Sequence, residues 1–266
     1  MVLLKILVTN DDGVYADGIW TLARQLSKIA RVIIVAPDRE QSAVGTAVSL
    51  RRPLRVQKIS PLISGIEAYS VEGTPSDSVI VALGKVIPEK VDLVVSGINQ
   101  GSNLGEDVLI SGTVGAALAA YLRGFPALAI STGLWSDSQL NDTAKLTASL
   151  VKRIASVKLP HSLFLNINMP EIPLPEVQGI KITRLAPKSH VNSVEEGHDG
   201  KKAYYTLVRA AVNEQEDKRT DIWAIRHGYI SITPLHLFLR DRFPTLMLEK
   251  IISGLLVELK QGDTGV

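Results

Sequence analysis

Two adjacent aspartates, Asp11 and Asp12, follow the first apolar run of the chain. The run Leu3–Thr9 predicts a buried strand, and Gly13 allows a sharp turn after it. Neighbouring carboxylates at the end of a buried strand repel each other unless a cation lies beside them. A polar turn with one Asp as a helix N-cap is the structural alternative. We expect the pair to bind a divalent metal ion.

Two further polar loops follow predicted strands. Residues 38–45 come after the strand 31–36, and residues 97–112 come after the strand 91–96. Ligands of open α/β sheets bind beyond the carboxyl ends of the strands, so these loops should meet the aspartates. A Ser hydroxyl and an Asn carbonyl from them would be suitable neutral ligands. Such oxygen ligands favour Mg²⁺ or Mn²⁺.

Ser111, Gly112 and Thr113 begin a predicted helix of small residues, 113–123. Hydroxyls and backbone N–H groups at a helix N-terminus form an anion site that suits phosphate. A simple helix cap is the alternative. A divalent cation beside an anion site indicates phosphoryl chemistry.

Several enzyme classes are disfavoured by the motifs around the first strand. Asn10 occupies the position of the nucleophilic aspartate in haloacid-dehalogenase-type phosphatases, and an amide cannot form an aspartyl phosphate. The chain also lacks the P-loop motif and the dinucleotide-binding Gly-x-Gly-x-x-Gly after its first strand.

Composition limits the remaining classes. The 266 residues are 45% hydrophobic and only 5% aromatic, which suits a large aliphatic core of parallel strands. A formal charge of +2 argues against a nucleic-acid polymer as partner. There are no cysteines, no visible signal peptide and no apolar run of the ~18 residues that span a membrane. We expect a cytoplasmic protein without a membrane partner.

The order of elements predicts an α/β fold. Strands and helices alternate through the first part of the chain, which is typical of a doubly wound, mostly parallel sheet. We expect a catalytic core at 1–170 and a β-rich extension with a terminal helix at 171–266. Within the extension, we expect a polar loop at 188–202 and an apolar-striped helix at 241–260.

Six motifs together resemble the SurE family, the stationary-phase survival proteins, which are metal-dependent 5′-nucleotidases. They occur in the family order and span nearly the whole chain, at residues 6–13, 36–42, 73–77, 96–103, 111–117 and 228–235. The resemblance implies a Rossmann-like core. It also implies dimers that exchange C-terminal elements, and often tetramers through an extended hairpin. Leu109-Ile110 departs from the family pattern, which often has a Tyr before Ser111.

The resemblance also implies roles for individual residues. One divalent cation per subunit would be bound by four side chains, those of Asp11, Asp12, Ser42 and Asn99. The phosphate would be bound by Ser111, Gly112 and Thr113, with Asn103 nearby.

We therefore expect a divalent-metal-dependent phosphomonoesterase that acts on nucleoside 5′-monophosphates. A metal-activated water would release phosphate, and Asp11 and Asp12 would be catalytic. Further candidate substrates are 3′-nucleotides and short polyphosphate. The alternatives are a non-catalytic nucleotide-binding regulator and a metal-dependent hydrolase of another ester or amide.

Overall fold

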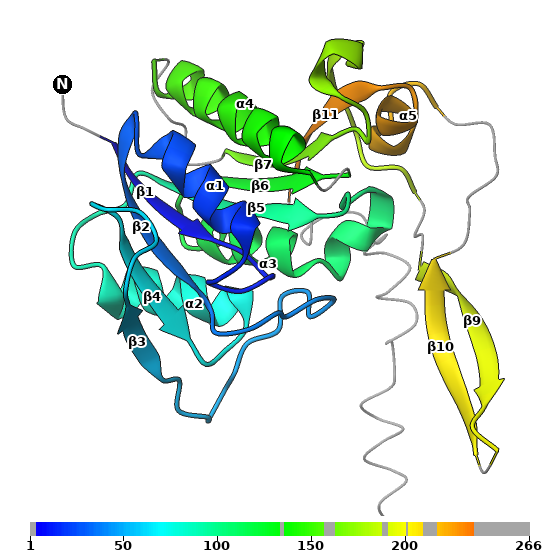
Figure 1. The fold of residues 1–266 in the computed structure, drawn as a ribbon, viewed down its shortest axis with the longest axis horizontal. Helices are drawn as coiled ribbons and strands as arrows, with labels where there is room; N and C mark the ends of the chain where they lie inside the picture. Colours follow the sequence, from blue (N-terminus) through cyan, green and yellow to red (C-terminus); the bar gives the residue numbers. More distant parts are fainter. Residues whose placement is uncertain are drawn as a thin grey trace, which may run out of the picture. The chain divides into compact units, whose positions relative to one another are not determined.

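A computed structural model describes residues 4–133, 136–156, 163–187, 191–200, 202–209 and 217–236 of the chain. Contacts between residues separate a unit of residues 1–235 from a unit of residues 236–266, and the account below concerns the first. Its centre is one large sheet, shown edge-on with its helices in Figure 1.

Nine strands among the described residues form this sheet, in the order β3-β4-β2-β1-β5-β6-β7-β11-β8. Their bounds are β1 Leu4–Thr9, β2 Ala30–Pro37, β3 Val56–Ile59, β4 Glu67–Val71, β5 Leu93–Gln100, β6 Ala127–Thr132, β7 Phe164–Met169, β8 Gly179–Ile182 and β11 Tyr229–Pro234. The strands from β4 to β7 in this order are parallel, whereas β3 and β11 run antiparallel to their neighbours β4 and β7. The expected doubly wound, mostly parallel sheet is therefore confirmed.

Helices cover both faces of the sheet (Figure 1). On one face α1 (Asp17–Leu26) contacts α4 (Asp137–Ser156), and on the other α2 (Pro75–Val81) contacts α3 (Gly112–Tyr121). The alternation of side chains along β1 divides the core between these layers: Ile6 and Val8 belong to the α1–α4 cluster, and Leu7 to the α2–α3 cluster. Strands covered on both faces are apolar at most positions, which explains the long apolar runs in the sequence.

Short helical segments complete the first unit. A π-helical turn, η1 (Ala82–Val86), extends α2, and two 3₁₀ turns occupy η2 (Gly105–Leu109) and η3 (Leu174–Glu176). A last helix, α5 (Asp221–Arg226), precedes β11. No helix within the described ranges has both the length and the apolar content of a membrane span.

Three local expectations differ from the structure. The sequence predicts the first helix over residues 17–30, whereas α1 ends at Leu26, because Ala30 already pairs with Leu4 as the start of β2. The strand β5 continues to Gln100 through a register shift, so the loop after it is shorter than expected.

The third difference concerns the expected polar loop at 188–202. It contains β9 (Val191–His198), which pairs antiparallel with β10 (Ala203–Arg209). The strand β9 has the sequence VNSVEEGH, in which polar residues predominate, so no apolar alternation marks it as a strand. The expected helix at 241–260 lies outside the described residues.

Candidate metal and phosphate site

The order of the strands creates a crevice at the carboxyl ends of β1 and β5. β1 has β2 on one side and β5 on the other, so the connections that leave these strands diverge there. Asp11 and Asp12 follow β1, and Asn99 lies at the end of β5. Parallel strands end at one edge of the sheet, which explains why loops distant in sequence meet here.

Asn10 shapes the turn that presents the two aspartates. Its Nδ2 donates a hydrogen bond to the carbonyl oxygen of Gly13 at 2.9 Å, and its Oδ1 accepts one from the Gly13 N–H at 3.2 Å. Gly13 has a φ of 101°, and an added Cβ would lie 3.0 Å from the carbonyl carbon of Arg39. Asn10 is therefore a turn-forming residue, in agreement with the sequence argument against a nucleophile at this position.

Asp11 joins three segments of the site. The Thr113 hydroxyl donates a hydrogen bond to Oδ1 of Asp11, and the Gln41 N–H donates to the Asp11 carbonyl oxygen at 2.7 Å. Gly112 lies so close that an added Cβ would be 2.7 Å from the Asp11 Cβ. The first turn of α3 and the loop after β2 are thus packed directly against this carboxylate.

Asp12 carries an unusual buried oxygen. Its Oδ2 is inaccessible to solvent and has no hydrogen-bond partner among the described residues. Burial, followed by the charges of Asp11 and Glu40, raises the pKa of Asp12 to about 7. Burial also raises the pKa of Asp11, even though the Thr113 hydrogen bond acts in the opposite direction. The protein alone therefore compensates this pair of negative charges poorly.

Ser42 and Asn99 present neutral oxygens to the same region. The Asn99 amide nitrogen donates to the carbonyl oxygens of Gly101, at 2.7 Å, and Gln100, at 3.2 Å, which leaves its Oδ1 to act as an acceptor or ligand. The exposed Ser42 hydroxyl donates to the carboxylate of Glu40 at 2.5 Å.

Asn103 is held by a buried network of amides. The backbone N–H of Asn103 donates to the side-chain oxygen of Asn168 at 2.8 Å. The side-chain nitrogen of Asn103 donates to the Ser131 hydroxyl at 2.9 Å. The side chains of Asn166 and Asn168 both donate to its carbonyl oxygen, at 2.8 and 3.1 Å. Such a network fixes the position of the loop after β5.

Ser111 is the N-cap of α3, where its hydroxyl accepts from the Val114 N–H at 3.2 Å. The simple helix cap considered from the sequence is thus part of the structure. Ser111 also lines the cavity that is described in the next paragraph, so capping and anion binding are compatible at this position.

A cavity of about 130 Å³ collects most of the predicted residues. Its walls are Asp11, Ser42, Ala43, Asn99, Gln100, Asn103, Asp107, Ile110 and Ser111. Three predicted residues, Asp12, Gly112 and Thr113, do not line it but are bonded to or packed against Asp11.

Two acidic residues that the sequence did not single out also belong here. Asp107 lines the cavity, and the charge of Glu40 acts on both aspartates. Both residues lie in loops identified as polar from the sequence, Glu40 in 38–45 and Asp107 in 97–112, but no motif marked either residue individually.

The donor set fits a hard divalent cation. Two carboxylates, a hydroxyl and an amide oxygen are suitable ligands for Mg²⁺ or Mn²⁺, which retain several waters. A cation would also give the buried Asp12 Oδ2 a partner. Within the described ranges, no three His, Cys, Asp or Glu side chains gather as a metal cluster, so this set depends on its neutral oxygens.

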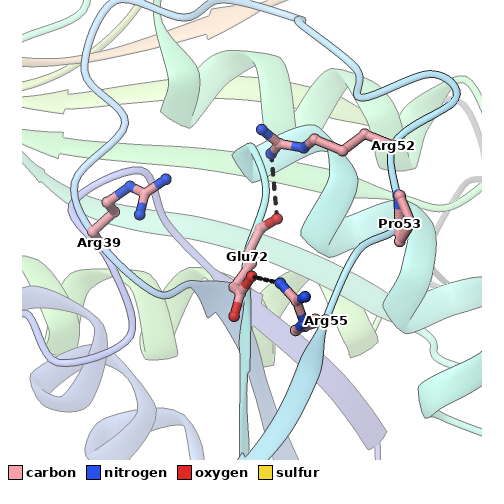
Figure 2. A pocket seen from close by; sticks show the side chains of 5 residues that line it. All are labelled: Arg39, Arg52, Pro53, Arg55 and Glu72. Atoms are coloured by element: carbon pink, nitrogen blue, oxygen red, sulfur yellow. Dashed lines mark hydrogen bonds and ion pairs between the residues drawn. The ribbon is translucent and has the colours of Figure 1, made fainter.

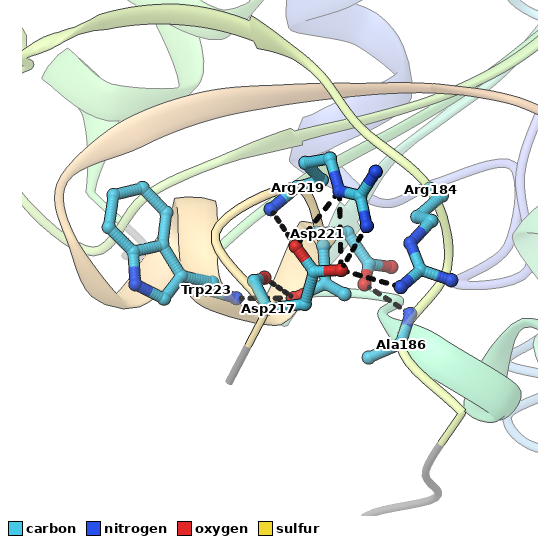
Figure 3. Close-up of polar contacts among 7 residues, drawn as sticks. Arg184, Ala186, Asp217, Arg219, Asp221 and Trp223 are labelled. Atoms are coloured by element: carbon cyan, nitrogen blue, oxygen red, sulfur yellow. Dashed lines mark hydrogen bonds and ion pairs between the residues drawn. The ribbon is translucent and has the colours of Figure 1, made fainter. Parts of the chain in front are cut away.

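Asp221 of α5 is bonded to the loop that carries Asn103. Its Oδ2 accepts from the Gly105 N–H at 2.8 Å, and its Oδ1 accepts from the N–H groups of Ala186 and Ile222 at 2.9 Å each. Figure 3 shows the bond with Ala186. The side chain is buried, and Gly105 lies two residues after Asn103. The segment after β7 thereby helps to hold the loop that carries Asn103.

These features define a class: α/β proteins with paired carboxylates and a helix N-terminus at the switch point of a doubly wound sheet. The model of the family described as Survival protein SurE matches residues 6–192, and the chain belongs to the SurE family.

Known proteins are similar to this chain in sequence and in structure over most of its length. A protein from Dehalococcoides mccartyi (strain CBDB1) named 5′-nucleotidase SurE is 54% identical over 235 residues, 88% of this chain and 89% of the relative. A protein of the same name from Carboxydothermus hydrogenoformans is 44% identical, over 90% and 92% of the two chains. The crystal structure of the SurE protein from Aquifex aeolicus has a TM-score of 0.77 and 33% identity, and covers 94% of this chain and 98% of its own.

Proposed function

We propose that this protein hydrolyses nucleoside 5′-monophosphates to nucleoside and inorganic phosphate. It is a 5′-nucleotidase of the SurE family, like the relatives that bear this name at 44% and 54% identity. One structural observation carries the proposal: a single cavity collects Asp11, Asn99, Asn103 and Ser111 at the switch point of the sheet. The residues that we propose as cation ligands and as an anion site thus lie together.

Divalent-metal dependence is general in the SurE family, and we propose one Mg²⁺ or Mn²⁺ per subunit. Its ligands would be Asp11, Asp12, Ser42 and Asn99. Support comes from the buried, partnerless Oδ2 of Asp12 and from the raised pKa values of both aspartates. When bound, such a cation polarises a phosphoryl oxygen and lowers the pKa of a bound water.

The residues of this chain would orient the substrate around that centre. The Ser111 hydroxyl and the N–H groups of Gly112 and Thr113 lie at the N-terminus of α3 and would bind phosphoryl oxygens. Asn103, fixed by its amide network, would contact the same phosphate. We assign acceptance of the proton of the attacking water to the pair Asp11 and Asp12.

Phosphate release from a panel of compounds tests the proposal. Nucleoside 5′-monophosphates should release phosphate with Mn²⁺ or Mg²⁺ and none with EDTA, and Asp11→Asn should abolish turnover while the circular dichroism spectrum is unchanged. The panel should include 3′-nucleotides and short polyphosphate. Tight nucleotide binding without phosphate release would instead indicate a regulator. Near-normal activity of Asp11→Asn would refute the assignment of the site.

We also propose that the subunit forms a homodimer or homotetramer through residues 171–266, with exchanged C-terminal elements. The hairpin of β9 and β10 exposes several large apolar side chains, which are Val194, Tyr204, Tyr205 and Leu207. Light scattering of the full chain measures the assembly. The cysteine-free composition is compatible with the reducing cytoplasm, which we propose as the location.

A further inference from the structure

A second cavity, of about 350 Å³, is lined by three arginines and a single carboxylate. Its walls are Arg39, Arg52, Pro53, Arg55 and Glu72 (Figure 2), hereafter the arginine cavity. None of these residues belongs to the metal and phosphate site described above, so the arginine cavity has no assigned role.

The arginine cavity lies at the same edge of the sheet as the metal site. Arg39 follows β2 and Glu72 follows β4, and both strands are parallel to β1. The backbone of Arg39 also packs against the turn that carries the aspartates, since a Cβ on Gly13 would lie 3.0 Å from the Arg39 carbonyl carbon. One continuous loop supplies Arg39, the site residue Ser42, and Arg52.

Glu72 occupies only part of the donor capacity in the arginine cavity. Its carboxylate accepts from Nη1 of Arg55 at 2.9 Å, and its carbonyl oxygen accepts from Nη2 of Arg52 at 3.4 Å. Arg39 makes a 3.5 Å contact with Asp38. Each guanidinium carries five N–H donors, so these three contacts leave most of the donors for a ligand.

The guanidinium groups converge on one space. Figure 2 shows Arg39 and Arg52 pointing toward each other from opposite sides, with Arg55 below. Arg39 and Arg55 are largely exposed, with side-chain accessibilities of 69% and 81%. Exposed ion pairs contribute little to stability, so the fold alone gives little reason to concentrate three arginines here.

We propose that the arginine cavity is a second oxyanion site, which binds a phosphate group. Guanidinium groups bind phosphate through paired hydrogen bonds, and the three positive charges exceed the two negative charges of Glu72 and Asp38 by one. The phosphate could come from two sources, free inorganic phosphate or a second phosphate group on a substrate bound at the neighbouring metal site. Binding of free phosphate stands independently of the hydrolytic activity, whereas binding of a second substrate phosphate rests on the proposed function.

Calorimetric titration of the full chain with inorganic phosphate tests the site directly. The double variant R52A/R55A should lose one binding event, or bind there about tenfold more weakly, because charge-assisted hydrogen bonds are removed. Glu72→Gln should act in the opposite direction and tighten the same event several-fold, because it removes the competing carboxylate. Arg24→Ala, an exposed arginine of α1, is the matched control and should bind as the wild type does.

Kinetics then distinguish the two sources of phosphate. If the second phosphate of a substrate is bound, R52A/R55A lowers kcat/KM for a nucleoside 3′,5′-bisphosphate but not for the 5′-monophosphate. If free phosphate is bound, the wild type shows a non-competitive effect of added phosphate that the variant lacks. Unchanged monophosphate turnover also shows that the variant is folded.

The proposal is overturned if R52A/R55A and Glu72→Gln both bind phosphate with wild-type stoichiometry and affinity. Because two variants with opposite expected effects are compared, loss of folding in one of them cannot imitate the expected result. Failure of this test would not contradict the proposed function, because phosphate binding at the metal site is measured separately as competitive inhibition.

Discussion

The hydroxyl of Thr113, in the first turn of α3, donates a hydrogen bond to the carboxylate of Asp11 at the end of β1. This bond joins the two halves of the site, because Asp11 belongs to the expected cation ligands and α3 to the expected phosphate site. Orientation of a ligand by its hydrogen-bonded neighbour commonly determines metal affinity and reactivity.

Thr113→Val should therefore weaken both Mn²⁺ binding and turnover, by about 10- to 100-fold. Valine has the shape of threonine but cannot donate to Asp11, whose burial is then even less well compensated. Calorimetry with Mn²⁺ and the kcat for a 5′-monophosphate measure the two effects. Thr143→Val is the control, since Thr143 is buried in α4 and bonds only to its own helix. Wild-type Mn²⁺ affinity in Thr113→Val would contradict the link.

Gly112→Ala should abolish most of the activity. The added Cβ would lie 2.7 Å from the Asp11 Cβ and 2.9 Å from its Oδ2, so either α3 or the carboxylate must move. Displacement of a catalytic group by about 1 Å can cost about 100-fold in rate.

A second glycine provides the control for this variant. Gly84→Ala, where no atom lies within 4 Å of the new Cβ, should retain the wild-type rate. The prediction fails if the two alanine variants have the same kcat/KM.

Asp221→Asn should lower both stability and catalysis. The carboxylate accepts three backbone N–H bonds, and an amide offers fewer acceptor positions and adds an N–H that faces donors. We expect a loss of about 1–3 kcal/mol in the free energy of unfolding, measured in urea, because buried N–H groups lose their partners.

The effect on the site can be separated from the loss of stability. Because Gly105 is near Asn103, KM for the 5′-monophosphate should also rise at a temperature at which the variant is fully folded. Asp142→Asn, at a partly exposed position of α4 that pairs with Lys145, should alter neither quantity. An unchanged KM in folded Asp221→Asn would show that the residue serves stability alone.

Asp217 makes the stability depend on pH in the acid range. The guanidinium groups of Arg219 and Arg184 hold the pKa of Asp217 well below its ordinary value of 3.8 (Figure 3). A lowered pKa in the folded state stabilises the protein above pH 3.8, and this contribution is lost as the pH falls below it.

Asp217→Asn should therefore be less stable than the wild type by a constant amount between pH 7 and pH 5. The difference should shrink below about pH 4, where the Asp217 carboxylate of the unfolded wild-type chain begins to take up a proton while that of the folded chain stays charged. Urea unfolding of both proteins at several pH values measures it. A difference that grew toward acid pH would contradict the assigned direction of the pKa.

Much of the fold was predictable from local patterns. The apolar runs at β1, β2 and β6 are continuous because both faces of these strands are covered, and the Thr-Pro-Ser-Asp cap at 74–77 marks the start of α2. By contrast, β9 carries no apolar pattern, and only its pairing with β10 in the structure identifies it as a strand. Strand ends such as Gln100 depend on the neighbouring strand rather than on their own sequence.

The sequence by itself determined the kind of chemistry, because residue types set it: two adjacent carboxylates, neutral oxygen ligands and a helix N-terminus indicate a cation and a phosphate. Only the tertiary structure decided which atoms meet. It placed Thr113 on Asp11, buried one oxygen of Asp12 without a partner, and brought Glu40 and Asp107 into the site. It also gathered Arg39, Arg52 and Arg55 around one cavity. Contacts between distant segments follow from the order of the strands and the packing of the helices, which no local spacing encodes.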